Sequence, residues 1–250
     1  MGLDLKRDDN GLLGQRGDWY NVRDITRQAK IEKITSYTLS RVLVGTDCKG
    51  NSYDITNAKN LTTRGIIPQK YERETIDILR KRVEPLIKAS KHLNNEFVKY
   101  GDYLRYIGRN VKDGKKLIIS GQPFTMAEPM AVVLAKTYEE QERRNFVYCT
   151  PGQLLARKGY SFTDDAVRYQ ELACRYPLLV LAHLGTEDDS KRNIAALYEM
   201  LLQREYNRLS SIIVTSCDLQ ELTKRYGANF VDLLKENTTY IDVRYVTKAE

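Results

Sequence analysis

The sequence predicts an α/β fold with a mostly parallel, five-stranded sheet in the second half of the chain. Five short apolar runs lie there, and helical segments separate them. Apolar runs of this length without polar alternation are typical of strands buried on both faces, and intervening helices favour right-handed crossovers between parallel strands. The runs are LIIS (117–120), FVYC (146–149), LLVLAHL (178–184), SIIVTS (211–216) and YIDVRYV (240–246).

The N-terminal part has a different character, and we expect a small appendage over 1–60 followed by the main domain over 61–250. The spacing of apolar residues permits a short helix within 19–33. After it, TSYTLSRVLV alternates, GTDCKGN supplies turn residues and SYDI follows, which together predict a β-hairpin. Two interpretations stay open: the appendage docks a partner, or it covers an edge of the sheet.

Helices are predicted on both sides of the first strand. Two helical patterns precede it, over about 72–89 and 91–109, and Pro85 is expected to kink or split the first. Thr150 and Gln153 resemble a capping box that opens a helix directly after the second strand. The predicted helix over 192–209 has an apolar stripe of Ile194, Leu197, Tyr198, Leu201 and Leu202, with Glu199, Gln203, Arg204 and Asn207 facing away.

Composition favours a soluble, intracellular protein with polyanionic partners. The formal net charge is +7, which favours nucleic acid first among such partners. The four cysteines lie far apart, and the only histidines are His92 and His183, so neither a zinc site nor a disulfide framework is expected. The sequence holds no signal-like N-terminal run and no 18-residue apolar stretch, so no membrane association is expected.

The order of motifs resembles the DnaC/IstB group of AAA+ proteins, which are bacterial and phage helicase loaders and transposition helper ATPases. A strand, GQPFTMAE, a helix, LLVLAHLG, a long helix and IIVTSCDLQELTKRYG follow one another, over roughly residues 60 to 246. The resemblance implies a P-loop NTPase fold in which the strand over 117–120 lies beside the strand over 211–216. It also implies a phosphate loop and an acidic motif at matching places.

The stretch that matches the phosphate loop lacks the residues that bind phosphate. A working loop reads G-x-x-x-x-G-K-[ST]: its backbone N–H groups and its lysine hold phosphates, and its hydroxyl holds Mg²⁺. Gly121 is present, but Phe124 and Met126 stand at glycine positions, where their side chains would fill the space for phosphate. Ala127 replaces the lysine, and Glu128 places a negative charge at the hydroxyl position.

The other family motifs are altered as well. Ala182 and His183 stand where acidic residues hold magnesium and orient water, and Cys217 stands where an asparagine senses the γ-phosphate. Asn229 and Leu233 occupy positions of expected arginines. His183 could be a replacement base or a polar residue at a strand end, and Cys217 a reactive thiol or a buried small residue; we favour the second interpretation of each.

These losses predict a pseudo-ATPase with no catalytic residue, no cofactor and no metal. We expect a non-catalytic helicase-loader-like protein of DNA replication, whose partners are a replicative helicase or an active AAA+ relative and single-stranded DNA, with oligomers allowed. Two alternatives remain. One is a DNA-binding accessory factor of transposition, and the other is a nucleotide-using enzyme with an altered site.

One segment, KYGDYLRYIGRNVKDGKK over 99–116, is a candidate for the contact with single-stranded DNA. Cations that meet phosphates and aromatic rings that stack on bases are what single-strand binding uses. The alternative is a helix that packs its tyrosines on the sheet and turns its basic edge to solvent. The candidate residues are Lys99, Tyr100, Tyr103, Arg105, Tyr106, Arg109, Lys112, Lys115 and Lys116.

Overall fold

The computed structural model describes residues 44–46, 52–54, 67–122 and 125–244. The chain divides into two compact units, Met1–Thr63 and Arg64–Glu250. Among the described residues, no helix is both long enough and apolar enough to cross a membrane.

In the first unit, β1 (Val44–Thr46) and β2 (Ser52–Asp54) form an antiparallel pair in which Gly45 lies opposite Tyr53. This pairing confirms the predicted hairpin. The helix predicted within 19–33 lies outside the described residues.

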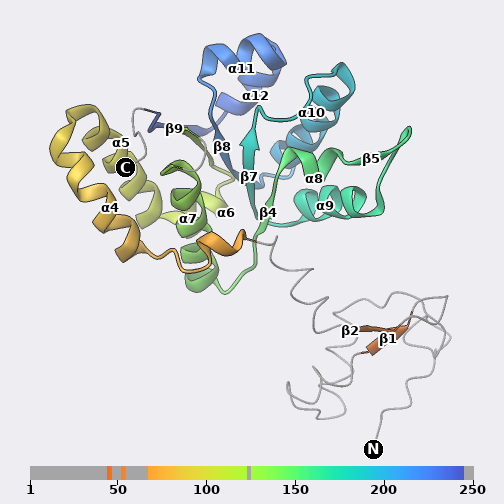
Figure 1. Cartoon of the computed structure of the whole chain (residues 1–250), viewed down its shortest axis with the longest axis horizontal. Helices are drawn as coiled ribbons and strands as arrows, with labels where there is room; N and C mark the ends of the chain where they lie inside the picture. The colour runs from red at the N-terminus through yellow and green to blue at the C-terminus, as the bar shows by residue number, and fades with distance from the viewer. Residues whose placement is uncertain (1–43, 47–51, 55–66, 123–124, 245–250) are drawn as a thin grey trace, which may run out of the picture. The chain divides into compact units, whose positions relative to one another are not determined.

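The second unit is built on a five-stranded sheet in which every neighbouring pair of strands is parallel (Figure 1). The spatial order is β4-β7-β8-β3-β9, so β3 lies beside β8 as predicted, with Leu117 opposite Ile212 and Ser120 opposite Thr215. The strands are β3 (Lys116–Ser120), β4 (Val147–Cys149), β7 (Leu178–Leu184), β8 (Ser210–Thr215) and β9 (Thr238–Asp242).

Helices cover both faces of this sheet, which gives three layers (Figure 1). Leu117 and Ile119 of β3 belong to the core under α4–α7, whereas Ile118 belongs to the core under α8–α12, because successive strand residues point to opposite faces. The helical elements are η1 (Gln69–Tyr71), α4 (Ile76–Ala89), α5 (Lys91–Arg105), α6 (Ile107–Lys112), α7 (Ala127–Glu142), α8 (Pro151–Leu155), α9 (Asp164–Arg175), α10 (Lys191–Tyr206), α11 (Leu219–Tyr226) and α12 (Ala228–Lys235).

Local sequence signals are confirmed at some helix ends and overridden at others. The capping box of Thr150 and Gln153 opens α8 as predicted. Pro85 does not split its helix, since α4 continues past the proline to Ala89. Apolar residues on both sides of Pro85 pack on the same core and hold the two parts of the helix in place. Ser90 ends α4 instead, and its hydroxyl accepts a hydrogen bond from the Leu93 amide that starts α5.

Arg204 of α10 is buried, so the prediction that it faces solvent is wrong. Its guanidinium donates to the Ser211 hydroxyl at 2.9 Å and to the Tyr176 carbonyl at 3.1 Å, and also to the carbonyls of Ala173 and Ser210. Burial lowers the pKa of Arg204 to about 9. The side chain is drawn inward because the end of α9 leaves carbonyls without helical partners.

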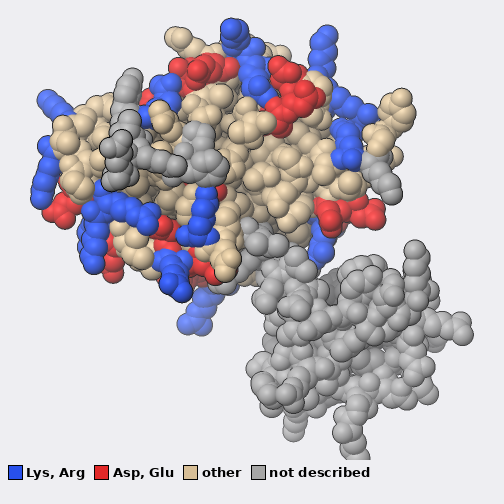
Figure 2. Space-filling model, in the orientation of Figure 1, with Lys and Arg blue, Asp and Glu red and all other residues tan. Residues whose placement is uncertain are grey.

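Charged side chains are spread over the face of the molecule seen in Figure 2. Lys and Arg lie around this face with Asp and Glu between them. Among the residues coloured in that view, Lys and Arg therefore do not form one continuous basic patch.

Candidate functional site

The connection from β3 to α7 lies at the carboxyl edge of the sheet, where parallel α/β folds place their ligands. The amide of Gly121 donates to the carbonyl of Thr215 on β8 at 2.9 Å. A Cβ on Gly121 would stand 2.7 Å from the Cβ of Ala127 and 3.0 Å from Cγ2 of Val243, so this position has room only for glycine. Phe124 lies outside the described residues.

The two residues that precede Glu128 are buried. Met126 belongs to the apolar core under α4–α7, and Ala127 opens α7. Met126 therefore contributes to core packing. Ala127, at the position of the phosphate-binding lysine, sits against Gly121 and has no polar group to offer.

Glu128 lies in the first turn of α7 and is only 2% exposed. The Tyr71 hydroxyl donates to its Oε2 at 2.6 Å, and the Tyr148 hydroxyl donates to its Oε1. Nε2 of His183 lies 3.3 Å from Oε1, and Nζ of Lys70 lies 3.7 Å from Oε2. We call these five residues the Glu128 cluster.

The contacts of the Glu128 cluster set its protonation. Burial alone would raise the pKa of Glu128, but hydrogen bonds from His183, Tyr148 and Tyr71 together outweigh burial and lower the pKa to about 2. Burial, followed by the hydrogen bond to Glu128, raises the pKa of both Tyr71 and Tyr148. At neutral pH the cluster therefore contains one ionised carboxylate and two protonated phenols.

His183 reaches Glu128 because β7 is irregular near its end. The register between β7 and β8 shifts between Leu181 and Leu184, and His183 has a φ of 63°. A bulge of this kind re-aims a side chain, and histidine adopts the left-handed conformation more readily than most residues. Ala182, the other position of the acidic motif, is fully buried in the core.

Little space remains beside the Glu128 cluster. The cavity there has a volume of about 10 Å³, which is close to the minimum for one water molecule. Its described lining consists of Gly121, Gln122, Glu128, His183, Thr186, Val214, Thr215 and Ser216. The structure thus brings the loop after β3, the end of β7 and the end of β8 to one small cavity.

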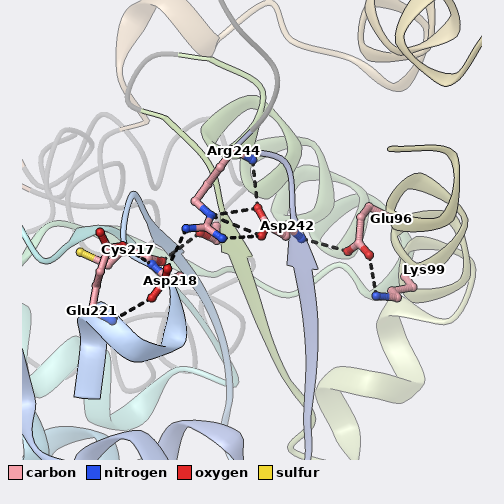
Figure 3. Close-up of polar contacts among 8 residues, drawn as sticks. Glu96, Lys99, Cys217, Asp218, Glu221, Asp242 and Arg244 are labelled. Carbon is pink, nitrogen blue, oxygen red and sulfur yellow. Dashed lines mark hydrogen bonds and ion pairs between the residues drawn. The ribbon is translucent and has the colours of Figure 1, made fainter. Parts of the chain in front are cut away.

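A second polar network joins the end of β8 to the end of β9 (Figure 3). The Arg244 guanidinium binds Asp242 with an Nη2–Oδ2 distance of 2.8 Å and reaches Oδ2 of Asp218 at 3.0 Å. The carbonyl of Cys217 accepts a hydrogen bond from the Ser120 hydroxyl at 2.9 Å. These bonds tie the ends of β3, β8 and β9 together. The backbone around Cys217 is thereby fixed to the strand that leads into the phosphate loop.

The two positions of expected arginines lie on α12. Asn229 is exposed, and Leu233 is half-buried against the core under α8–α12. Neither residue carries a cation to a neighbouring ligand.

The tyrosines of the 99–116 segment do not form a stacking surface. Tyr100 and Tyr103 are buried, and their hydroxyls donate to the carbonyls of Met130 at 3.1 Å and Lys115 at 2.8 Å. Tyr106 alone of the three is exposed, at the break between α5 and α6. Tyr106 lies beyond the last residue of α5, so its exposed ring does not continue the buried face that carries Tyr100 and Tyr103.

The basic residues of this segment are also partly committed to other contacts. Lys116 is buried and forms an ion pair with Glu205, and Lys99 pairs with Glu96 at 2.6 Å. Nε of Arg109 lies 3.7 Å from a carboxylate oxygen of Asp113, and Nζ of Lys115 lies 6.0 Å from the centre of the Tyr103 ring. Arg105 and Lys112 are exposed. Tyr100, Tyr103 and Lys116 are buried and therefore not available to bind a strand, and the two tyrosines follow the alternative in which they pack on the sheet.

Comparisons with known proteins identify the fold. No family model matches the sequence, and a search of curated proteins finds no significant relative. The crystal structure of DnaI matches with 14% identity and a TM-score of 0.54, over 72% of this chain and 95% of that one. The crystal structure of the DnaC helicase loader matches with 19% identity and a TM-score of 0.55, over 70% and 99%. A putative primosome component from Streptococcus pyogenes serotype M3 matches with 10% identity and a TM-score of 0.56, over 73% and 92%.

At these identities the likeness concerns the fold. The chain shares the fold of the DnaI structure and of the DnaC helicase loader structure, which confirms the fold that the sequence resemblance predicted. Sequence reasoning located Gly121, Glu128 and His183 at the site but missed Tyr71 and Tyr148. The signal available for Tyr148 was a single polar-tipped residue in an otherwise apolar strand.

Replacing Glu128 with Gln is expected to reduce the acid sensitivity of the fold. Since the folded pKa of about 2 lies below the ordinary 4.5, Glu128 stabilises the fold above pH 4.5. That contribution, at most about 3 kcal/mol, is lost as the pH falls from 4.5 towards 2. Urea unfolding at several pH values should show a smaller loss of unfolding free energy in this range for Glu128→Gln than for the wild type. The exposed control Glu199→Gln should follow the wild type. Parallel curves for all three proteins would show that Glu128 is not held ionised.

Proposed function

We propose that this chain is a helicase-loader-like protein of DNA replication that binds a replicative helicase or an active AAA+ relative and does not hydrolyse ATP. The observation that carries the proposal is the contact between Glu128 and His183 at the place where P-loop proteins hold phosphate and magnesium. The link to replication rests on the fold, which resembles that of a helicase loader. Direct contact with single-stranded DNA is part of the proposal.

The chemistry of Glu128 supports the loss of nucleotide binding. A triphosphate needs N–H groups and cations around it, and its magnesium needs oxygen ligands. Glu128 is ionised, and its carboxylate oxygens already accept hydrogen bonds from the hydroxyls of Tyr71 and Tyr148. Its negative charge would repel the γ-phosphate. His183 offers nitrogen where magnesium requires oxygen. In a working site, the residues at both positions would bind the metal ion. In this chain, the two side chains contact each other instead.

The space beside Glu128 supports the same conclusion. The Cβ of Ala127 lies against Gly121, and the adjoining cavity of about 10 Å³ has room for about one water molecule. A phosphate group would have to displace the side chains that line this cavity. The described residues of the site therefore do not fit magnesium-bound ATP.

What remains of the site favours a role in binding other proteins. The sheet, both helical layers and the links between the ends of β3, β8 and β9 are intact. Asn229 on the exposed face of α12 offers no cation to a nucleotide on a neighbouring subunit. In this proposal the chain acts by occupying a place in an assembly, without hydrolysing ATP itself.

ATP binding to the wild type and to a rebuilt loop tests the loss of nucleotide chemistry. Calorimetric titration with ATP and magnesium is expected to show no saturable heat for the wild type up to about 1 mM, because each lost charge contact weakens binding by a few kcal/mol. The variant Phe124→Gly, Met126→Gly, Ala127→Lys, Glu128→Thr should regain some binding but no hydrolysis, since His183 remains.

The single variant Glu128→Thr is the matched control for the rebuilt loop. It removes the charge and the contact with His183, but it restores neither the lysine nor the glycines, so it should not bind ATP measurably. A low-micromolar dissociation constant for the wild type would contradict the proposal.

Complex formation with the replicative helicase of the same host tests the proposed role. We expect the full chain and the helicase to co-elute in gel filtration, either alone or with the active loader present. Because this chain is proposed not to bind ATP, adding ATP should not change the amount of complex through this chain. To separate the two proteins' nucleotide needs, the helicase is used with its own phosphate-loop lysine replaced. Absence of a complex with both the helicase and the active loader would contradict this role.

A further inference from the structure

The described part of the second unit begins with residues 67–75, a short segment that we call the strap (Figure 1). It contains η1 and ends at Thr75, which caps α4. Its only buried side chains are those of Tyr71 and Glu74. Its internal backbone bonds are local, from the Tyr71 amide to the Pro68 carbonyl at 2.8 Å and from the Glu74 amide to the Tyr71 carbonyl at 3.1 Å. The position of the strap therefore depends on its contacts with other elements.

One lysine of α7 binds three backbone carbonyls of the strap. Nζ of Lys136 donates to the carbonyl of Tyr71 at 2.9 Å, to that of Glu72 at 2.6 Å and to that of Glu74 at 3.1 Å. An ammonium group has three N–H donors, so the number of donors matches the number of carbonyls. Hydrogen bonds from a charged donor are stronger than those between neutral groups. Lys136 is therefore one anchor of the strap on α7.

The second anchor is Glu128, at the start of the same helix. The Tyr71 hydroxyl donates to Oε2 of Glu128 at 2.6 Å, and Nζ of Lys70 lies 3.7 Å from the same oxygen. The other oxygen, Oε1, is contacted by Tyr148 and His183, which belong to the sheet. Both contacts from the strap thus fall on Oε2. Removing the strap would take these two contacts from Oε2 and leave those on Oε1 in place.

The closed strap also contains an unfavourable feature. Glu74 is only 5% exposed, and its Oε1 forms an ion pair with Arg82 of α4 at 2.8 Å. Its Oε2 is buried without a hydrogen-bond partner among the described residues. A buried carboxylate oxygen without a donor costs free energy, because water would otherwise hydrate it. Opening of the strap would return this oxygen to water, so the closed position is opposed by a term that opening removes.

We propose that the strap is a latch over the Glu128 cluster, which opens and closes as one unit and, when open, leaves Oε2 of Glu128 in contact with water. Local opening is typical of segments with few buried side chains. The two anchors, Glu128 and Lys136, lie about 12 Å apart along the axis of α7, so the strap is what links them. The strap continues the chain from the first unit, and a pull on that unit would act on the latch. The latch goes beyond the proposed function, since it opens the site around Glu128 without a nucleotide.

Amide hydrogen exchange of the full chain, followed by NMR, tests whether the strap opens as one unit. In the wild type, the amides of Tyr71, Glu72 and Glu74 should exchange at similar opening equilibria. They should exchange at least about tenfold faster than the amides of Ile118 and Ile213 in the central strands. Exchange of the strap at the same rate as the central strands would overturn the proposal, because the strap would then open only when the whole domain unfolds.

The variant Lys136→Met removes the ammonium and keeps most of the length of the side chain. Exchange of the strap amides should become roughly 10- to 100-fold faster, since bonds from a charged donor are lost. Lys88→Met is the matched control: its ammonium is exposed on α4 and pairs with Glu84, so this change should leave the strap unaffected. An equal effect of both variants would show that loss of a positive charge, and not loss of an anchor, is responsible.

Carboxyl labelling with a carbodiimide and glycinamide tests whether the opening reaches Glu128. The labelling rate of Glu128, measured by mass spectrometry, should rise in Lys136→Met by the same factor as the exchange of the strap amides. Glu140, exposed on the same helix, is the internal reference and should be labelled equally in both proteins. Faster exchange without faster labelling of Glu128 would overturn the proposal, because the two ends of the strap would then move independently.

The variant Tyr71→Phe applies the same test from the other end and keeps the ring in the core. It should speed exchange at Glu74, beside the Lys136 anchor, and should speed labelling of Glu128. It also keeps the proposal testable if Lys136→Met does not fold. An effect of Tyr71→Phe on Glu128 alone, with exchange at Glu74 unchanged, would contradict a single latch. Each of these measurements uses the chain by itself, so the latch can fail while the proposed function holds.

Discussion

An ionised carboxylate buried in a protein needs hydrogen-bond donors on every side, and the arrangement around Glu128 supplies them. Tyr71 comes from the segment before α4, Tyr148 from β4 and His183 from the bulged end of β7. The carboxylate therefore links α7 to three elements that are far apart in the sequence. Loss of one donor would leave a buried charge without its partners, so these residues depend on one another.

In the function we propose, this dependence keeps the fold intact around a site that no longer binds phosphate. In the resemblance to the helicase loaders, the positions of Glu128 and His183 would both serve magnesium. Here, Glu128 accepts a hydrogen bond and His183 donates it, and we propose that the pair takes the place that a metal ion would fill. The second network, from Ser120 and Cys217 to Arg244, keeps the neighbouring strand ends in register. The scaffold is then available for binding other proteins and DNA, the functions we propose.

The sequence was sufficient for the sheet because strands such as LIIS and LLVLAHL are buried on both faces and cannot be mistaken for amphipathic elements. Motif order was also sufficient to bring Gly121, Glu128 and His183 together at one end of the sheet, where they line one cavity. It could not predict the partners of Glu128, since Tyr71 lies 57 residues away and only the folded sheet brings Tyr148 near. The sequence does not predict that Arg204 is buried, and it leaves open whether Tyr103 is, because a polar group at the end of a long or aromatic side chain can be buried where backbone carbonyls accept its hydrogen bonds.

The most direct test of the central claim is the energetic coupling between Glu128 and His183. A double-mutant cycle of Glu128→Gln and His183→Gln, measured by urea unfolding near pH 6, isolates their interaction. The strain of a non-glycine residue at φ 63° occurs in both backgrounds and cancels. If the pair replaces the metal site, the two substitutions should be non-additive by about 1 kcal/mol or more. Additive effects within about 0.3 kcal/mol would contradict the account, because Glu128 would then be stabilised without His183.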